Sequence, residues 1–165
     1  MIEKRIMKRV FFLILPLTLF LFAGHDGSAQ QAKRKVIHSS PPIEYGALKN
    51  PLTNEDPMTL PDNDPNIKAG RALYERTCAR CHGIRGDGKG PEAAGFSFPI
   101  KPVDFTDKEA IAAVSQGYVM WRIDEGGLDE PFRSAMPSWQ NDFTEKEKWQ
   151  IILYLYKNAG VSPKK

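Results

Sequence analysis

Apolar residues are spaced differently in three consecutive parts of the chain. Residues 10–24 form an almost uninterrupted apolar run, whereas residues 30–64 contain several prolines and few apolar positions with a regular period. From about residue 64 onward, apolar residues recur at intervals of three and four, which is the spacing of one face of an α-helix. The pattern therefore predicts a leader, an extended segment and a helical domain, in that order.

The helical domain is expected to begin with a helix that runs to about Cys78. Asp64 is a good N-cap, and Pro65 takes the first helical position, where its missing N–H costs nothing. The stripe that follows consists of Ile67, Gly70, Leu73, Tyr74 and Thr77. Because glycine inside a helix costs about 1 kcal/mol relative to alanine, Gly70 predicts the close approach of another helix.

A second strong helix is predicted at the C-terminal end of the chain. Thr144 and Glu147 form a capping box at its start, and the sequence Asn158-Ala159-Gly160 should end it. Its apolar stripe consists of Trp149, Ile152, Leu153 and Tyr156.

Two shorter helices are expected between these two. Thr106 with Glu109 is expected to open one, and residues 117–125 to form the other, which Gly126-Gly127 ends. No segment alternates apolar and polar residues for long enough to predict a strand.

The predicted fold class is therefore all-α, with three to five short helices in a domain formed by residues 65–165. Residues 83–105 and 127–143 form long loops that are rich in glycine, proline and polar residues. Loops of this length in a small domain usually wrap a ligand or carry another function.

Residues 30–64 are predicted to form an extended, proline-rich linker that precedes the domain. Such a spacer could hold the domain clear of a membrane. A second interpretation rests on the apolar residues of the segment, which could lie along the domain or dock onto a partner. These residues are Ile43, Tyr45, Leu48 and Leu52.

Residues 1–29 have the pattern of a secretory signal peptide. A basic cluster precedes the apolar run of Val10 to Gly24, and Gly27-Ser28-Ala29 offers small residues for cleavage. The run is shorter than a comfortable membrane span and Pro16 interrupts it, although an uncleaved membrane anchor remains the alternative. We therefore expect export to the periplasm or to the extracytoplasmic face of the membrane, with a membrane tether in the second case.

Charge and cysteine content narrow the function. The 165 residues carry a net charge of +3, and two of these charges belong to residues 1–29, so the rest is nearly neutral. Phosphate binding needs a concentrated excess of Lys and Arg, which argues against nucleic acid as the ligand. The 2 cysteines cannot build the disulfide framework that stabilises many small exported domains, so another element must do so.

Both cysteines lie in the sequence Cys78-Ala79-Arg80-Cys81-His82, which is the attachment pattern of a c-type haem. On one helical turn, two thiols can reach the two vinyl groups of a porphyrin, and the next residue places an imidazole under the iron. Covalent attachment would make the cofactor part of the fold of a small exported domain. We therefore expect one covalent haem c, bound by Cys78 and Cys81, with His82 as an iron ligand.

Three other interpretations of the same residues are weaker. A Cys78–Cys81 disulfide would close a very small loop and add little stability, and a thioredoxin-like pair needs a βαβ context. A zinc site needs four ligands, and the only other histidine beyond the leader is His38.

Met136 is the candidate for the second iron ligand. It lies in a turn-rich loop between two helices, Ser134 to Trp139, which can bend over a porphyrin. Met120 shares a helix face with apolar residues, as expected of a core side chain, and Met58 lies in the linker. His38 is a further, weaker candidate.

Other residues are expected to support these ligands. The second imidazole nitrogen of His82 should donate to a carbonyl, and the glycine-rich loop that follows could bring the carbonyl of Pro91 there. Trp139 and Tyr118 are candidates for covering the porphyrin or binding its propionates, with ordinary core packing as the alternative.

Residues 65–165 resemble the class I monohaem cytochromes c. The resemblance rests on the haem motif, on Met136-Pro137, and on residues of both terminal helices and the loop between 86 and 91, namely Gly70, Tyr74, Gly86 to Pro91, and Leu153-Tyr154. It implies the small cytochrome c fold, in which the first and last helices cross at glycine and aromatic contacts. It also implies iron ligation by His82 and Met136, with Pro91 accepting a hydrogen bond from the histidine.

The expected function is electron transfer between redox protein partners, without catalysis. Members of the family also occur as haem subunits of larger respiratory complexes, so both a free periplasmic carrier and a complex subunit are expected roles. The alternative is a haem enzyme or a ligand-sensing haem protein whose sixth ligand is displaceable. In a third interpretation the haem only stabilises an assembly.

Overall fold

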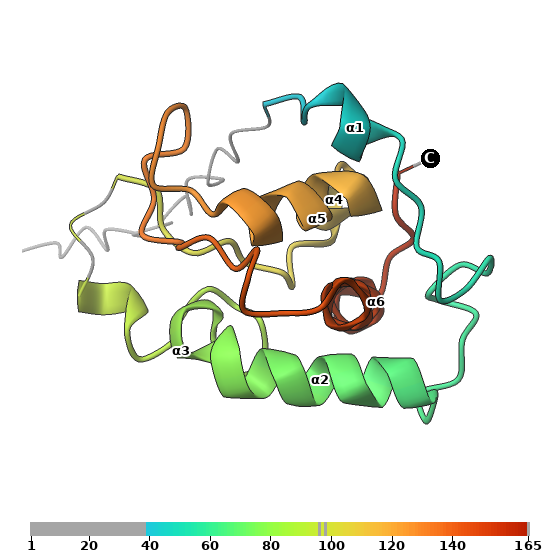
Figure 1. Ribbon diagram of the computed structural model, residues 1–165. Coiled ribbons are helices and arrows are strands. Elements are labelled where there is room, and N and C mark those ends of the chain that lie inside the picture. The colour runs from blue at the N-terminus through green and yellow to red at the C-terminus, as the bar shows by residue number, and fades with distance from the viewer. Residues whose placement is uncertain (1–38, 96, 98, 165) are drawn as a thin grey trace, which may run out of the picture. The chain divides into compact units, whose positions relative to one another are not determined.

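The computed structural model of the chain describes residues 39–95, 97 and 99–164. The predicted leader and His38 lie outside the described residues. All described residues belong to one compact unit, Arg34–Lys165. Its α-helices are α1 (Ile43–Gly46), α2 (Pro65–Thr77), α3 (Ala79–His82), α4 (Lys108–Ala112), α5 (Gln116–Glu125) and α6 (Glu145–Ala159) (Figure 1). A 3-10 helix, Ala93–Gly95, lies in the loop after α3.

The all-α prediction is confirmed over the described residues. Five of the six α-helices, α2 to α6, lie within the predicted domain, and no strand is present in the described part. An isolated parallel bridge joins Ile100 to Ser134. None of the described helices is long and apolar enough to cross a membrane.

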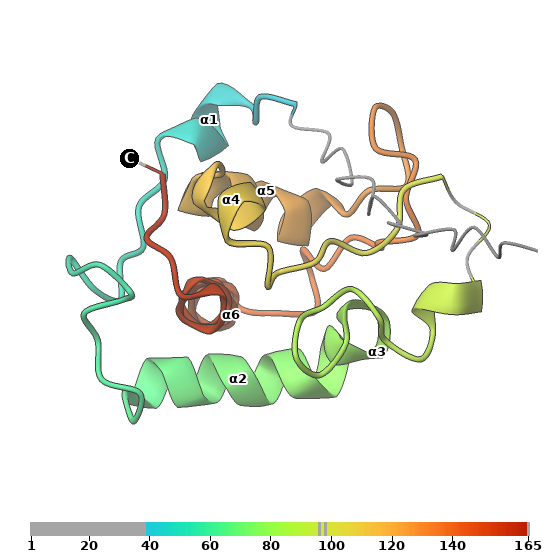
Figure 2. The ribbon, with the colours of Figure 1, turned by 180° about the vertical axis from the view of Figure 1, so that it is seen from behind.

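Helices α2 and α6 cross at a point where their backbones touch. Figures 1 and 2 show α6 end-on above α2, which lies in the plane of the view, so the two axes cross at a steep angle. A Cβ atom at Gly70 would overlap the carbonyl oxygen of Gln150. The side chain of Gln150 also donates a hydrogen bond of 3.0 Å to Asn66. The prediction that a second helix approaches Gly70 is confirmed, and that helix is α6.

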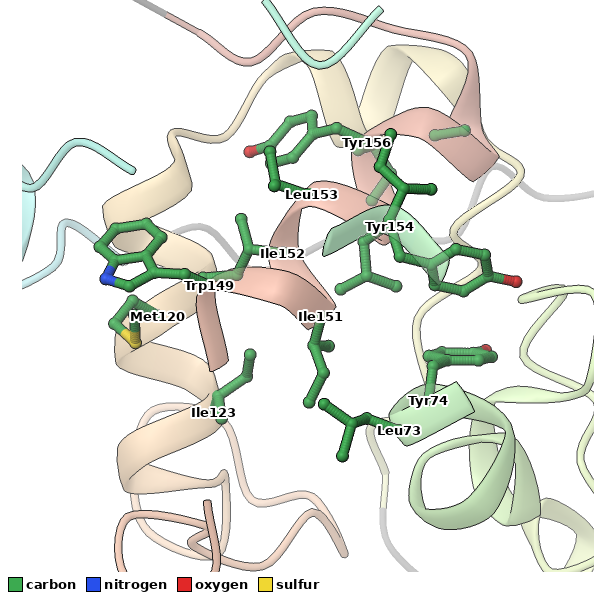
Figure 3. Close-up of a cluster of buried hydrophobic side chains, with 14 of the residues drawn as sticks. Leu73, Tyr74, Met120, Ile123, Trp149, Ile151, Ile152, Leu153, Tyr154 and Tyr156 are labelled. Atoms are coloured by element: carbon green, nitrogen blue, oxygen red, sulfur yellow. The ribbon is translucent and has the colours of Figure 1, made fainter. Parts of the chain in front are cut away.

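The hydrophobic core lies around α6. Figure 3 shows Met120 of α5 beside Trp149 on one side of this helix and Tyr74 of α2 beside Tyr154 on the other. The ring centroids of Tyr74 and Tyr154 are 5.2 Å apart. Every residue from Lys148 to Tyr156 is buried. Because a buried large apolar side chain stabilises a protein by about 1.5–3 kcal/mol, α6 contributes more to the core of this small domain than any other described helix.

The predicted caps of the two long helices are present. The Asp64 carboxylate accepts from the backbone N–H groups of Asn66 and Ile67, and Pro65 is the first residue of α2. Thr144 and Glu147 form the capping box of α6, and Gly160 ends that helix in the left-handed conformation.

The predicted start of α4 is wrong by one residue. Asp107, and not Thr106, is the N-cap, because its carboxylate accepts from the backbone N–H of Ala110. The hydroxyl of Thr106 is engaged upstream, where it donates to Asp104 over 2.6 Å. Helix α5 matches its prediction closely and is capped by Ser115.

The described part of the predicted linker packs against the domain. We call residues 39–64 the N-terminal strap. It descends from α1 along the side of α6 to the start of α2 (Figures 1 and 2). The Asn50 side chain is buried and donates to the carbonyl of Trp149 over 3.2 Å, and Pro57 is fully buried. The prediction of an extended spacer is therefore wrong for these residues.

The second interpretation predicts that the apolar residues of the strap lie along the domain or dock onto a partner. Only some of them lie against the domain. Tyr45 and Leu52 pack against the core, whereas Ile43 is 92% exposed and Leu48 is partly exposed. Lys157 at the end of α6 donates to the carbonyl of Leu60 over 2.7 Å. Because the hydrogen bonds of the strap with α5 and α6 join groups distant in sequence, no apolar period in residues 30–64 could predict them.

We expect the substitution Gly70→Ala to lower the free energy of unfolding by about 1–3 kcal/mol, the usual cost of overpacking. Helix propensity alone would make the alanine variant more stable by about 1 kcal/mol. A decrease in the free energy of unfolding would therefore come from the contact with the α6 backbone. Urea unfolding of the haem-loaded chain measures it. Gly46→Ala is the matched control, because nothing lies within 4 Å of a Cβ atom there. Equal stability of the two variants would contradict the crossing described above.

Candidate haem site

The haem motif forms one continuous helical turn at the end of α2. Cys78 caps α2 and precedes α3, and its backbone N–H donates to the carbonyl of Tyr74 over 2.8 Å. The carbonyl of Cys78 in turn accepts from Cys81 at 3.1 Å and from His82 at 2.9 Å. The crossing of α2 and α6 therefore also fixes where the two thiols and the imidazole lie.

The chemistry of the two cysteines agrees with neither a disulfide nor a zinc site. Both are free thiols. Burial raises the pKa of Cys78 to about 12 and also raises the pKa of Cys81, so both thiols are protonated at neutral pH. No group of three or more His, Cys, Asp or Glu side chains that could hold a metal ion occurs in the part of the chain described.

The His82 imidazole is held from two directions by the segment that precedes α4. Its Nδ1 atom lies 3.2 Å from the carbonyl oxygen of Val103, and its ring stacks on Phe105 with centroids 4.7 Å apart. Removal from bulk water lowers the pKa of His82, which favours the neutral ring that binds metals. With Nδ1 donating to the carbonyl, Nε2 remains for iron.

The prediction that Pro91 supplies this carbonyl is wrong. The glycine-rich loop returns to the backbone of α3, where Gly90 donates to Cys81 over 3.1 Å and Glu92 donates to Arg80 over 2.9 Å. These bonds fix Pro91 at an exposed position beside α3. Val103 is 21 residues from His82, and no local spacing in the sequence connects the two.

The loop that follows the haem motif is hydrogen-bonded to α2, to the segment before α4 and to α6. The hydroxyl of Tyr74 donates to the carbonyl of Gly83 over 2.8 Å, and Phe105 donates from its backbone to Gly86 over 2.6 Å. Asn158 of α6 donates to the carbonyl of Arg85 over 3.1 Å. The predicted family contacts of Tyr74 thus extend to the residue that directly follows His82.

Met136 is held at the C-terminal end of α5 by backbone hydrogen bonds. Gly127 donates to the carbonyl of Met136 over 2.8 Å and accepts from Ser134 over 2.7 Å. Gly126 adopts a φ of +67°, and a Cβ atom there would overlap the backbone of Pro137. The two glycines predicted to end a helix therefore also allow the methionine segment to approach that helix.

The two long loops of the domain meet at one end of the molecule. Figures 1 and 2 both show α3 and the 127–143 loop at the same end. The bridge between Ile100 and Ser134 joins two segments, one just before Val103 and the other just before Met136.

The remaining candidates have different surroundings. Trp139 is half-buried, packs against Phe143 with centroids 5.8 Å apart, and donates from its backbone to Ile123. Tyr118 lies edge-on to Trp121. Met120 is 3% exposed within the core, as expected of a structural side chain, whereas Met58 lies on the strap and is 36% exposed.

Comparison with known proteins agrees with this geometry. Residues 65–155 match the model of the family described as cytochrome c oxidase, cbb3-type, subunit III. The chain belongs to this family of c-type cytochrome domains. No curated protein matches the chain.

The chain is similar to one chain in a solved structure, that of the Kuenenia stuttgartiensis reducing HAO-like protein complex Kustc0457/Kustc0458. That chain is 31% identical over 60% of this chain and 46% of its own length, with a TM-score of 0.48. The match therefore spans less than half the length of that chain.

The residues present fit the haem that this family binds. Two free thiols three positions apart on one helical turn, followed by a neutral imidazole with one nitrogen already engaged, are the donor set that a c-type haem requires. The domain is thus a haem protein with a cytochrome c fold, and its chemistry is haem-based electron transfer.

We expect Tyr74→Phe to lower the free energy of unfolding by about 1–3 kcal/mol, because the buried carbonyl of Gly83 loses its donor. Thermal or urea unfolding of the haem-loaded chain measures the change. Tyr154→Phe is the matched control, since that hydroxyl makes only a long contact of 3.5 Å with Asn158. If Tyr74→Phe were no more destabilising than Tyr154→Phe, Tyr74 would not hold the loop.

Proposed function

We propose that this protein transfers electrons through a single covalent haem c, with His82 and Met136 as axial ligands of the iron. The observation that carries the proposal is the helical turn that brings Cys78, Cys81 and His82 together beside the carbonyl of Val103. The chain contains no other cysteine, so it can hold one haem by two thioether bonds.

The residues of the domain have separate roles in this proposal. Bound haem supplies a one-electron couple. Cys78 and Cys81 fix the porphyrin to α2 and α3, and the hydrogen bond from His82 to Val103 sets the orientation of the imidazole and raises its basicity.

Met136 is proposed as the sixth ligand because of where the other methionines lie. Met120 is enclosed in the core, and Met58 is on the strap. Met136 lies in a loop that hydrogen bonds tie to α5 and that touches the chain leading to Val103. Methionine with histidine raises the reduction potential relative to two nitrogen ligands, which suits an electron carrier.

A bound methionine also argues for a carrier and against an enzyme. The thioether would occupy the iron position that oxygen or a substrate needs, whereas a haem enzyme or a ligand sensor needs that position open. We therefore propose redox proteins as partners, with a membrane respiratory complex among them, as a free carrier or as a haem subunit.

We further propose that the protein is exported. The basic cluster and apolar run of residues 1–29 support transport to the periplasm or to the extracytoplasmic face of the membrane. If residues 1–29 are retained, they would tether the domain to the membrane.

Substitution of the two proposed ligands should have different effects. We expect His82→Ala to abolish stable haem incorporation. Met136→Ala should keep the haem, eliminate the weak far-red absorption band of sulfur ligation, and permit carbon monoxide binding at neutral pH. It should also lower the reduction potential by an amount on the order of 0.1 V, within the ~0.8 V range that axial ligands span.

Met58→Ala is the matched control, because this methionine is exposed on the strap. It should leave the absorption spectrum and the potential unchanged. An unaltered spectrum for Met136→Ala would contradict the ligand assignment. Rapid binding of carbon monoxide by the unsubstituted reduced protein would favour an enzyme or a sensor.

A further inference from the structure

A buried ion pair joins α5 and α6 next to the loop that carries Met136. The ammonium group of Lys148 on α6 contacts a carboxylate oxygen of Asp124 at the end of α5, and only 9% and 12% of the two side chains are exposed. The other carboxylate oxygen accepts from the hydroxyl of Tyr45 over 3.0 Å. Lys148 also donates to the carbonyl of Gln140 over 2.9 Å. The pair thus joins α5, α6, the strap and the 127–143 loop.

Stability alone does not explain this pair. Removing two charges from water costs several kcal/mol per ion, so well-packed apolar residues of similar volume are often at least as stabilising. In some proteins a buried polar pair instead fixes one geometry that apolar contacts would leave free. Burial and the adjacent Asp124 carboxylate raise the pKa of Tyr45 to about 12, so its hydroxyl is a donor at neutral pH.

The hydrogen bonds around the pair converge on the segment that follows Met136. Lys148 holds Gln140, the Ser138 hydroxyl donates to the backbone carbonyl of Asp124, and Trp139 donates from its backbone to Ile123 over 2.9 Å. Residues 138–140 are therefore attached to α5 and α6 at three successive positions.

A pocket lies on the strap side of this attachment. It has a volume of about 240 Å³, opens to solvent, and is lined by residues of the strap, α5 and α6, together with Gln140 of the loop. The lining is formed by Tyr45, Leu48, Met120, Asp124, Gln140, Glu145 and Lys148. At this pocket, the described contact between α6 and Gln140 is the hydrogen bond from Lys148.

We propose that Lys148 and Asp124, completed by Tyr45 of the strap, are positioning residues that keep the Met136 thioether at the sixth position of the haem iron. This inference rests on the proposed ligation by Met136. It assigns the strap a role in the redox site, because the hydroxyl of Tyr45 donates a hydrogen bond to the Asp124 carboxylate, which in turn binds Lys148.

The test combines two measurements on the haem-loaded full chain: carbon monoxide binding to the reduced form, and the intensity of the far-red sulfur-ligation band of the oxidised form. Lys148→Met keeps the volume of the side chain but removes its charge and its bond to Gln140. We expect the band to weaken and carbon monoxide binding to accelerate about tenfold, which corresponds to about 1.4 kcal/mol of lost ligand positioning. Tyr45→Phe should produce a smaller acceleration in the same direction.

Lys157→Met is the matched control on the same helix. Lys157 binds the strap through Leu60 and Asp62, and no contact joins it to residues 134–140 among those described. It should leave the band and the carbon monoxide rate unchanged. Equal acceleration in Lys148→Met and Lys157→Met would overturn the proposal, because any loosening of the strap would then suffice.

A double variant separates positioning from stability. Lys148→Met alone leaves a buried carboxylate without its cation, which is strongly destabilising. Asp124→Asn with Lys148→Met removes this charge, so resistance to urea should recover, while carbon monoxide binding should remain accelerated because Gln140 still lacks its donor. Recovery of both properties would show a purely structural pair and overturn the proposal.

Two further outcomes are decisive. If Lys148→Met does not yield folded protein, Tyr45→Phe carries the test, and an unchanged carbon monoxide rate in that variant overturns the proposal. If the unsubstituted protein binds carbon monoxide as fast as Met136→Ala, ligation by Met136 itself fails. If the unsubstituted protein binds carbon monoxide slowly and Lys148→Met binds it at the same rate, only the positioning role is refuted.

Discussion

The contact between the backbones of α2 and α6 at Gly70 and Gln150 is the constraint on which the rest of the domain depends. It allows the most buried helix to lie directly against the helix that ends in the haem motif. Because Cys78 continues α2 without a break, the crossing sets the position of the thiols and of His82. A side chain at Gly70 would separate the core from the cofactor site.

The two sides of the proposed haem site are built in different ways. The histidine side depends on local helix geometry and on one distant carbonyl, that of Val103. The methionine side depends on a loop that hydrogen bonds tie to α5 and α6, among them the bonds of Gly127 to Met136 and of Lys148 to Gln140. A loop held by a few polar bonds responds to its surroundings more readily than a helical turn, so under the proposed ligation by Met136 the strap would influence the iron.

Features encoded by neighbouring residues could be predicted from the sequence. The Asp64 cap, the capping box of Thr144 and the close approach at Gly70 each depend on a few adjacent positions or one helix face, and the haem motif spans five residues. The carbonyl partner of His82 and the docking of the strap depend on contacts between distant residues. Asn50, for example, reaches Trp149 across 99 positions, and no periodicity records such a pair.

The proposed function requires one porphyrin bound covalently to Cys78 and Cys81. Intact mass measurement after extraction with acidified acetone tests it most directly, on full-length protein from a host that matures c-type cytochromes. We expect the pigment to stay with the polypeptide and the mass to exceed that of the processed chain by one haem. A polypeptide of unmodified mass, with the pigment in the acetone phase or no pigment at all, would rule out covalent attachment.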